Sequence, residues 1–135
     1  MVCIWYYNNI IFVYLFARYD AMKRLDIIIP HERVGELNEV LHRHNVGGMT
    51  FYDIKGRGRS KNEPIYVGTG VMKYVPEFGL GTKVEVLVSD SQAKQIIDDI
   101  LNIISTGSAY DGKIFVYDVT EAYDIGTKKS GERAL

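Results

Sequence analysis

The chain has 135 residues, enough for one domain that buries its own core without a disulfide or a structural metal. Its 16 Lys and Arg residues nearly balance its 17 Asp and Glu residues, and the net charge of −1 excludes an overall attraction to nucleic acid or anionic lipid. The single cysteine, Cys3, excludes an internal disulfide and a cysteine-based zinc site. We therefore expect a protein of the reducing cytoplasm.

Residues 1–21 differ in character from the rest, because they are aromatic and almost uncharged. Their longest apolar stretch, residues 10–17, is far shorter than the roughly 20 residues that span a bilayer, and no basic segment precedes it. We expect residues 1–21 to be an atypical extension, with Met22 as a candidate start of translation, and residues 22–135 to be the domain. An added strand or an interfacial segment is the alternative.

The first regular unit follows Met22. KRLDIII (residues 23–29) predicts a strand that Pro30 ends. The stretch from His31 to Asn45 predicts an amphipathic helix that Gly47 and Gly48 end, with an apolar stripe of Val34, Leu37, Val40, Leu41 and His44. MTFYDIKG (residues 49–56) predicts a second strand.

The second unit repeats this order. TKVEVLV (residues 82–88) predicts a strand, and Ser89 with Gln92 has the form of a capping box at a helix start. The helix is expected to end at Thr106 and Gly107, with an apolar stripe of Ala93, Ile96, Ile97, Ile100, Leu101 and Ile104. KIFVYDV (residues 113–119) predicts the fourth strand.

Two β-α-β units in one domain predict the α+β, ferredoxin-like (βαββαβ) fold, a four-stranded antiparallel sheet with both helices on one face. The last strand carries apolar residues on both faces, and the first ends in three isoleucines. We interpret both sheet faces as apolar. Because the helices cover only one, we expect the other to be buried against further copies of the chain.

Residues 56–81 form an unusually long connection with six glycines and two prolines. Loops of this size inside a compact domain are typically functional or disordered. Its middle, IYVGTGVMKYV (residues 65–75), is compatible with a small hairpin. The segment after Val119 is expected to lie on the surface, with a short strand near its start.

Two glycine-bearing loops are candidate anion sites. TGSAYDGK (residues 106–113) follows a helix and ends in a lysine, an arrangement that can direct backbone N–H groups and a cation at a phosphate. KGRGRSK (residues 55–61) places four cations directly after a strand. For each, the local alternative is an ordinary turn or a solvated loop.

Other polar residues indicate little chemistry. His31, His42 and His44 are interpreted as surface residues or a helix-end cation, because two histidines at i and i+2 face different directions. No Ser/His/Asp or Cys/His arrangement is supported by chain order, and the carboxylate pair Asp98 and Asp99 falls on the polar face of a helix. We expect no catalytic residue and no metal site.

From Met22 onward the chain resembles the nitrogen-regulatory PII family of trimeric signal proteins. GGMTFYDIKGRGRSK (residues 47–61) resembles the second strand running into the long T-loop between strands 2 and 3, and TGSAYDGKIFV (residues 106–116) resembles the B-loop. The resemblance implies a non-enzymatic cytoplasmic homotrimer that binds ATP, ADP or a related nucleotide between subunits. It also implies a T-loop that engages a partner, a membrane transporter or an enzyme of nitrogen or carbon metabolism.

The resemblance implies roles for particular residues. Positions around the adenine and ribose are Ile28, Thr50, Gly56, Gly58, Glu85 and Leu87, and positions at the phosphates are Arg59, Asp111, Gly112 and Lys113. The T-loop residues expected to contact a partner are Lys61, Tyr66 and Tyr74, of which Tyr74 lies nearest the family's uridylylated tyrosine.

Several positions depart from the family pattern. Ser60 and Gly81 stand where a glutamine and a lysine hold magnesium and 2-oxoglutarate, so we expect binding of both to be weakened. Asp124 and Gly126 replace an RxR pair that reaches the phosphates from a neighbouring subunit, and Tyr110 replaces a B-loop glycine. Each lost charge-assisted contact is worth about 1.5–3 kcal/mol, which Lys128 and Lys129 offset in part.

Two alternatives use the same sheet topology. An RNA-binding module would stack bases on strand aromatics such as Phe115 and Tyr117, although the RNP1 pattern is not satisfied. A small acylphosphatase-type enzyme would need a catalytic constellation that the sequence does not supply.

Overall fold

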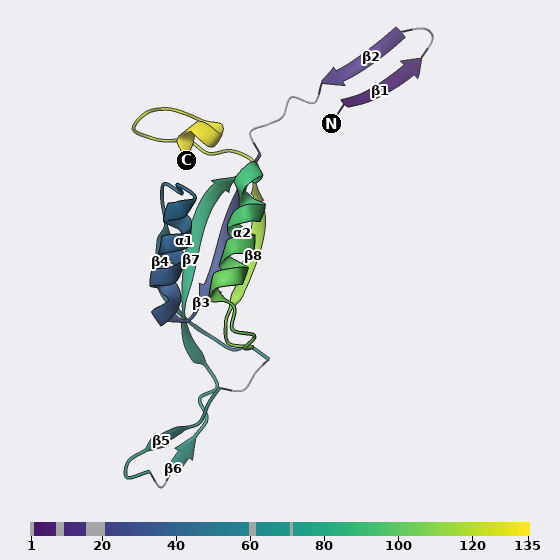
Figure 1. The fold of residues 1–135 in the computed structure, drawn as a ribbon. Coiled ribbons are helices and arrows are strands. Elements are labelled where there is room, and N and C mark those ends of the chain that lie inside the picture. Colours follow the sequence, from purple (N-terminus) through teal and green to yellow (C-terminus); the bar gives the residue numbers. More distant parts are fainter. Residues whose placement is uncertain (1, 8–9, 16–20, 60–61, 71) are drawn as a thin grey trace.

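The computed structural model describes residues 2–7, 10–15, 21–59, 62–70 and 72–135, with side chains from residue 21 onward. Figure 1 shows a sheet with two helices packed on one face and a thin hairpin that extends beyond one end of the sheet. The strands are β1 (Val2–Tyr7), β2 (Ile10–Leu15), β3 (Met22–Ile29), β4 (Thr50–Gly56), β5 (Ile65–Val67), β6 (Met72–Tyr74), β7 (Gly79–Ser89) and β8 (Lys113–Val119). The helices are η1 (His31–Arg33), α1 (Val34–Arg43), α2 (Asp90–Ile104) and η2 (Gly131–Ala134).

The main sheet has the strand order β4-β7-β3-β8, and its neighbouring strands are all antiparallel. This order, with α1 and α2 on one face, confirms the predicted ferredoxin-like fold (Figure 1). β8 has the predicted bounds, whereas β7 begins three residues before the expected start at Thr82. The longer β7 follows from its pairing with β4, which continues to Gly56 opposite Gly79.

The hydrophobic core lies between the sheet and the two helices. It comprises Leu25, Ile27, Ile29, Leu37, Val40, Leu41, Val84, Val86, Val88, Ala93, Ile96, Ile100 and Ile104. Both predicted helix stripes point into this core, with one exception: Leu101 is 54% exposed. Leu101 lies at the margin of a broad stripe, and the helix turns it toward solvent.

The start of α2 differs in detail from the expected capping box. Ser89 is the N-cap residue, but its hydroxyl donates to Gln92 Oε1 at 3.0 Å and makes no hydrogen bond to the helix backbone. The predicted helix start is therefore right and the predicted capping bonds are wrong, because the two side chains bond to each other. At this helix start, the Asp90 N–H donates a hydrogen bond to the Ala21 carbonyl at 2.7 Å.

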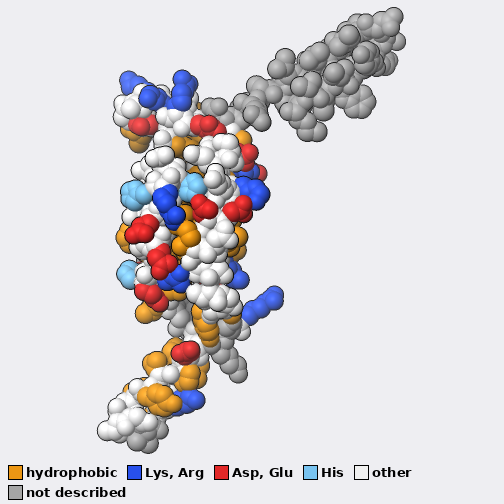
Figure 2. Space-filling model, in the orientation of Figure 1, with side chains coloured by type: hydrophobic (Ala, Val, Ile, Leu, Met, Phe, Trp, Pro, Cys, Tyr) orange, Lys and Arg blue, Asp and Glu red, His pale blue; other side chains and the backbone are white. Residues whose placement is uncertain are grey.

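The connection between β4 and β7, residues 57–78, forms an arm that extends from one end of the sheet (Figure 1). The expected hairpin is present as the β5–β6 pair, in which Ile65 lies opposite Tyr74. At the base of the arm, Arg57 pairs with Glu77 at 3.0 Å, and the Asn62 amide donates to the Pro76 carbonyl at 2.7 Å. Figure 2 shows hydrophobic side chains gathered on this arm and mixed charges over the helices.

The predicted short strand after Val119 is reduced to a single antiparallel bridge between Tyr123 and Ser130. The segment ends in η2. At the other terminus, β1 and β2 form a two-stranded sheet of their own. No helix among the described residues is long and apolar enough to cross a membrane.

The expectation that both faces of the main sheet are apolar is wrong. The face that carries Leu25, Ile27 and Val84 packs against the helices. The opposite face is here called the open face, and it carries Arg24, Asp26, Lys83, Glu85, Leu87, Phe115 and Tyr117. Its centre is charged, and its apolar residues lie around that centre. The register of the β3–β7 pair produces this charged centre, because it places Asp26 on β3 directly opposite Glu85 on β7.

Candidate functional site

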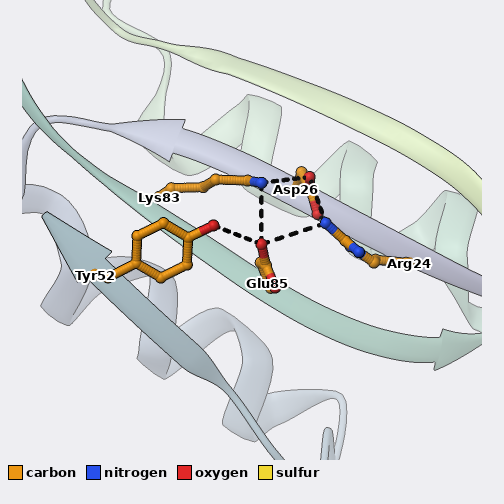
Figure 3. A network of polar contacts seen from close by, with 5 residues as sticks. All are labelled: Arg24, Asp26, Tyr52, Lys83 and Glu85. Carbon is orange, nitrogen blue, oxygen red and sulfur yellow. Dashed lines mark hydrogen bonds and ion pairs between the residues drawn. The ribbon is translucent and has the colours of Figure 1, made fainter. Parts of the chain in front are cut away.

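The centre of the open face is a network of five polar side chains from three strands (Figure 3). Arg24 donates to Asp26 from Nε at 2.6 Å and from Nη2 at 3.0 Å. Lys83 Nζ lies 2.8 Å from Asp26 Oδ2 and 2.9 Å from Glu85 Oε1. The Tyr52 hydroxyl donates to Glu85 Oε1 at 2.7 Å, so β3, β4 and β7 are linked through one set of contacts.

The network compensates its own charges, since it contains two cations and two carboxylates. Asp26 is 3% exposed, and the hydrogen bonds from Arg24, followed by burial acting in the opposite direction, leave its pKa below the ordinary value. The hydrogen bond from Tyr52 and the contact with Lys83 lower the pKa of Glu85. The hydrogen bond to Asp26 raises the pKa of Lys83, so all four groups stay ionised at neutral pH.

Exposed aromatic side chains flank this network. The Arg24 guanidinium lies 5.5 Å from the centroid of the Tyr117 ring, and Lys83 Nζ lies 5.8 Å from that of Tyr52. Phe115 and Tyr117 on β8 are about half exposed, as is Leu87 on β7. Aromatic residues are enriched where protein chains contact one another, and charges that are paired within the chain need no counter-charges from a partner, so this surface is suited to contact another protein chain.

The glycine-bearing loop of residues 106–112 is organised by its own carboxylate. Asp111 accepts hydrogen bonds from the Thr106 N–H at 2.6 Å, the Thr106 hydroxyl at 2.6 Å and the Ser108 N–H at 3.1 Å. The Thr106 hydroxyl is the largest cause of the lowered pKa of Asp111. An internal anion thus already holds the N–H groups of Thr106 and Ser108 at the start of the loop.

Gly112 joins this loop to the sheet. Its φ is +117°, and a Cβ atom at this position would lie 1.8 Å from the Ile28 carbonyl oxygen. No side chain fits there. Lys113, the next residue, pairs with Ile28 across the β3–β8 ladder. The structure therefore brings together four predicted site residues: Ile28, Asp111, Gly112 and Lys113.

The remaining predicted nucleotide-site residues lie toward the other edge of the sheet. Thr50 and Glu85 are directly paired between β4 and β7, and Leu87 lies two residues farther along β7. Gly56 ends β4, and Gly58 and Arg59 follow it into the arm. Because β7 and β3 separate β4 from β8, three strand spacings of about 4.8 Å put the two edges about 14 Å apart.

The predicted partner-contacting residues lie on the arm, apart from these groups. Tyr66 and Tyr74 are on β5 and β6 and are 68% and 55% exposed. Lys61 and Ser60, which carried predictions about the partner and about magnesium, lie outside the described residues. Gly81 is described, on β7, and a Cβ there would lie 3.4 Å from the Ile29 carbonyl oxygen.

Asp124, at one of the positions that depart from the family pattern, builds the C-terminal turn. Its carboxylate accepts the N–H groups of Gly126 at 2.8 Å and Thr127 at 3.0 Å, and the bond to Thr127 is the main cause of its lowered pKa. Lys128 then adopts a positive φ of 59°. Asp124 therefore has a structural role that its sequence position alone did not indicate.

Sequence reasoning missed most of the charged network. Arg24, Asp26 and Lys83 were assigned only to strands, although the charges in KRLD and TKVE were a visible signal. Of the two predicted roles for His44, surface residue or helix-end group, the position fits the second: His44 is the C-cap residue of α1, its side chain is 13% exposed, and its Nε2 lies 2.7 Å from Asp99 Oδ2 on α2. No three His, Cys, Asp or Glu side chains in the described part of the chain are grouped so that they could hold a metal ion.

Comparisons with known proteins agree with this architecture. The Nitrogen regulatory protein P-II of Pasteurella multocida (strain Pm70) is 35% identical over 115 residues, which cover 84% of this chain and 100% of that protein. The protein of the same name from Rhizobium meliloti (strain 1021) is 36% identical over 115 residues, which again cover 84% of this chain and 100% of that protein. The solved structure of the B. subtilis GlnK-ATP complex aligns with a TM-score of 0.69 and 26% identity, over 86% of this chain and 99% of that one.

The match to the family is continuous along the sheet, the helices and the arm. The model of the family described as Nitrogen regulatory protein P-II matches residues 22–129, which include β3 to β8 and the Asp124 turn. Together with relatives that are more than 30% identical and fully covered, this match shows that the chain belongs to the nitrogen regulatory protein P-II family.

Proposed function

We propose that the protein is a regulatory nucleotide sensor that binds an adenine nucleotide between two copies of the chain. The observation that carries this proposal is the division of the predicted site between opposite edges of one sheet. Lys113 and Gly112 belong to the β8 edge, whereas Thr50, Glu85 and Arg59 belong to the β4 side. A ring in which the β8 edge of one copy meets the β4 edge of the next completes one site per interface.

The open face supports the same assembly. Its charges are compensated within the chain, so a second copy need not supply counter-charges, and its exposed aromatic and aliphatic groups are available for contact. In a homotrimer three open faces would meet around the axis and the three edge-to-edge clefts would lie at the sides. The family's solved relative in complex with ATP supports the nucleotide as ligand.

We propose that the arm transmits the state of the cleft to a partner protein, a membrane transporter or an enzyme of nitrogen or carbon metabolism. The arm begins directly after Gly56 and contains Arg59, a proposed phosphate contact, and it presents Tyr66 and Tyr74 at a distance from the sheet. The ion pair between Arg57 and Glu77 connects the two ends of the arm at its base. Arg59 lies two residues along the chain from Arg57, so nucleotide binding at Arg59 would act on this ion pair.

Calorimetry with ATP, ADP and AMP tests the nucleotide proposal. Lys113→Ala is expected to weaken ATP binding about tenfold or more, because one charge-assisted phosphate contact is lost. Lys94→Ala is the matched control, since Lys94 is an exposed lysine that pairs with Asp98 on α2. The absence of heat with any nucleotide, or an equal loss in both variants, would overturn the proposal. We expect 2-oxoglutarate and magnesium to bind weakly, owing to Gly81 and Ser60.

A further inference from the structure

The hairpin of β1 and β2 precedes the part of the chain that matches the family. Its strands, Val2–Tyr7 and Ile10–Leu15, form a two-stranded sheet of their own, whereas the match to the family model begins at residue 22. The strand sequences, VCIWYY and IIFVYL, contain no charged residue. The fold shared with the relatives therefore does not account for this hairpin.

The ladder between the two strands joins only apolar and aromatic residues. Its antiparallel pairs are Val2 with Leu15, Cys3 with Tyr14, Ile4 with Val13, Trp5 with Phe12, Tyr6 with Ile11 and Tyr7 with Ile10. Successive residues of a strand belong to opposite faces of a sheet, so both faces of this hairpin are composed of such residues. A hairpin at an ordinary protein surface alternates apolar with polar residues, and this one has no polar face.

Such a hairpin requires surroundings that cover both of its faces. A two-stranded hairpin is marginally stable at best in water, and apolar residues on both faces add to the need for cover. One protein surface, or one further copy of the hairpin, covers one face and leaves the other in water. The boundary between lipid headgroups and acyl chains surrounds a thin element on both sides.

The residue types and the length of the hairpin fit this boundary. Trp5, Tyr6, Tyr7 and Tyr14 are of the two residue types that are enriched where membranes meet water. Six residues at about 3.4 Å each extend for about 20 Å. The hydrocarbon core is about 30 Å thick, so the hairpin is too short to cross it. The outer edges of a two-stranded sheet also keep unpaired N–H and C=O groups, which need water nearby.

We propose that the β1–β2 hairpin is an interfacial anchor that binds the surface of a lipid bilayer. It lies among the headgroups and the upper acyl chains, and it holds the regulatory domain at the membrane without crossing it. Apolar area removed from water drives the binding, because the hairpin has no charge with which to attract anionic lipid. None of the proposed nucleotide contacts belongs to this segment, so the proposal is independent of nucleotide binding.

Tryptophan fluorescence of the full chain tests the anchor, because Trp5 is the protein's only tryptophan. The probe is a titration with phosphatidylcholine vesicles, which carry no net charge. We expect the emission of Trp5 to move to shorter wavelength and to saturate, and the chain to float with the vesicles in a density gradient. Added phosphatidylglycerol or raised salt should change the affinity less than about twofold, since charge contributes little.

Substitutions at Val13, which pairs with Ile4, keep Trp5 as the reporter. Val13→Glu places a charge in the middle of the ladder and is expected to weaken vesicle binding at least about tenfold. Val13→Thr keeps the β-branched shape, so the strand is retained while a hydroxyl is added. It is expected to weaken binding about threefold. Leu101→Glu is the matched control, because it adds the same charge at a residue of α2 that is 54% exposed, and it should bind as the wild-type chain does.

Three results would overturn the proposal. The first is an emission of Trp5 that vesicles leave unchanged, including one that already shifts with protein concentration alone, which would mean that further copies cover the hairpin. The second is binding that needs phosphatidylglycerol and is lost at high salt, which would assign it to charged groups elsewhere. The third is equal affinity of Val13→Glu and Leu101→Glu. Far-ultraviolet circular dichroism of each variant separates lost binding from lost folding.

Discussion

The two faces of the main sheet come from alternate residues of the same strands, yet they differ in almost every physical respect. On the helix-covered face Leu25, Ile27 and Val84 are fully buried. On the open face the intervening residues Asp26 and Glu85 belong to a charged network, and aromatic side chains beside them remain exposed. The covered face is complete within one chain, whereas the open face has the composition of a contact surface.

Stability and binding are divided between the two faces of the sheet. The covered face stabilises the fold by removing apolar area from water, which needs only matching apolar residues. The open face instead carries charges that are paired within the chain and aromatic groups that remain exposed for contact.

The largest effect is expected on the covered face. Ile27→Ala leaves a cavity among fully buried side chains and should lower the free energy of unfolding by about 4 kcal/mol, as measured by urea denaturation. Leu101→Ala, at the exposed margin of α2, is the control and should cost less than about 1 kcal/mol. Similar losses in both variants would contradict the assignment of the core.

The next effect concerns Gly112, at the point where the loop after α2 enters β8 beside β3. Gly112→Ala combines a positive φ with a clash against the Ile28 carbonyl, and should lower the free energy of unfolding by about 3 kcal/mol. Gly107→Ala is the control, because Gly107 has a φ of +82° but open space around its Cα. Its cost should be about 1 kcal/mol. Equal costs would show that the close approach of the two strands is absent.

A smaller effect is expected at the centre of the open face. Asp26→Asn removes the carboxylate that Arg24 and Lys83 share, and should cost about 2 kcal/mol of unfolding free energy. Asp98→Asn breaks an exposed pair with Lys94 on α2 and should cost less than about 0.5 kcal/mol. If both variants lose the same small amount, the network is no more than a solvated surface pair.

The smallest effect is a dependence of stability on pH. The pKa values of Asp26 and Glu85 are lowered in the folded chain, so their contribution is present above the unfolded values of about 4 and is lost as pH falls through the folded values. Urea denaturation between pH 7 and pH 3 should show stability falling on acidification. In Asp26→Asn this fall should be shallower, and an unchanged slope would speak against the lowered pKa of Asp26.

Much of the fold followed from apolar spacing. The stripe of Leu37, Val40 and Leu41 located α1, and the apolar run of residues 113–119 located β8, because burial against one core imposes the period of each element. The extent of β7 could not be predicted in this way. Gly79 and Leu80 join the strand only because β4 pairs with them, and such pairing depends on a distant segment.

The candidate site was predictable only in part. Gly112 was visible as a glycine in a loop, but its contact with Ile28 depends on how β8 approaches β3. The network of Arg24, Asp26 and Lys83 requires the register of two ladders, which no local pattern contains. The hydrogen bonds among His31, Asp53 and Thr82 join residues from three elements, so the sequence offered only an isolated histidine.

Mixing two variants tests the two-chain site most directly. Lys113→Ala alters the β8 edge and Arg59→Ala the β4 edge, so each variant alone is expected to bind ATP weakly. If the chains form rings of three, co-refolding equal amounts gives rings of which about three quarters contain both variants. In each mixed ring one of the three junctions unites two intact edges, so about a quarter of all sites should bind tightly. Calorimetry counts these sites. Recovery of about a quarter is the predicted result, and a mixture that binds no better than the separate variants would contradict a site shared between two chains.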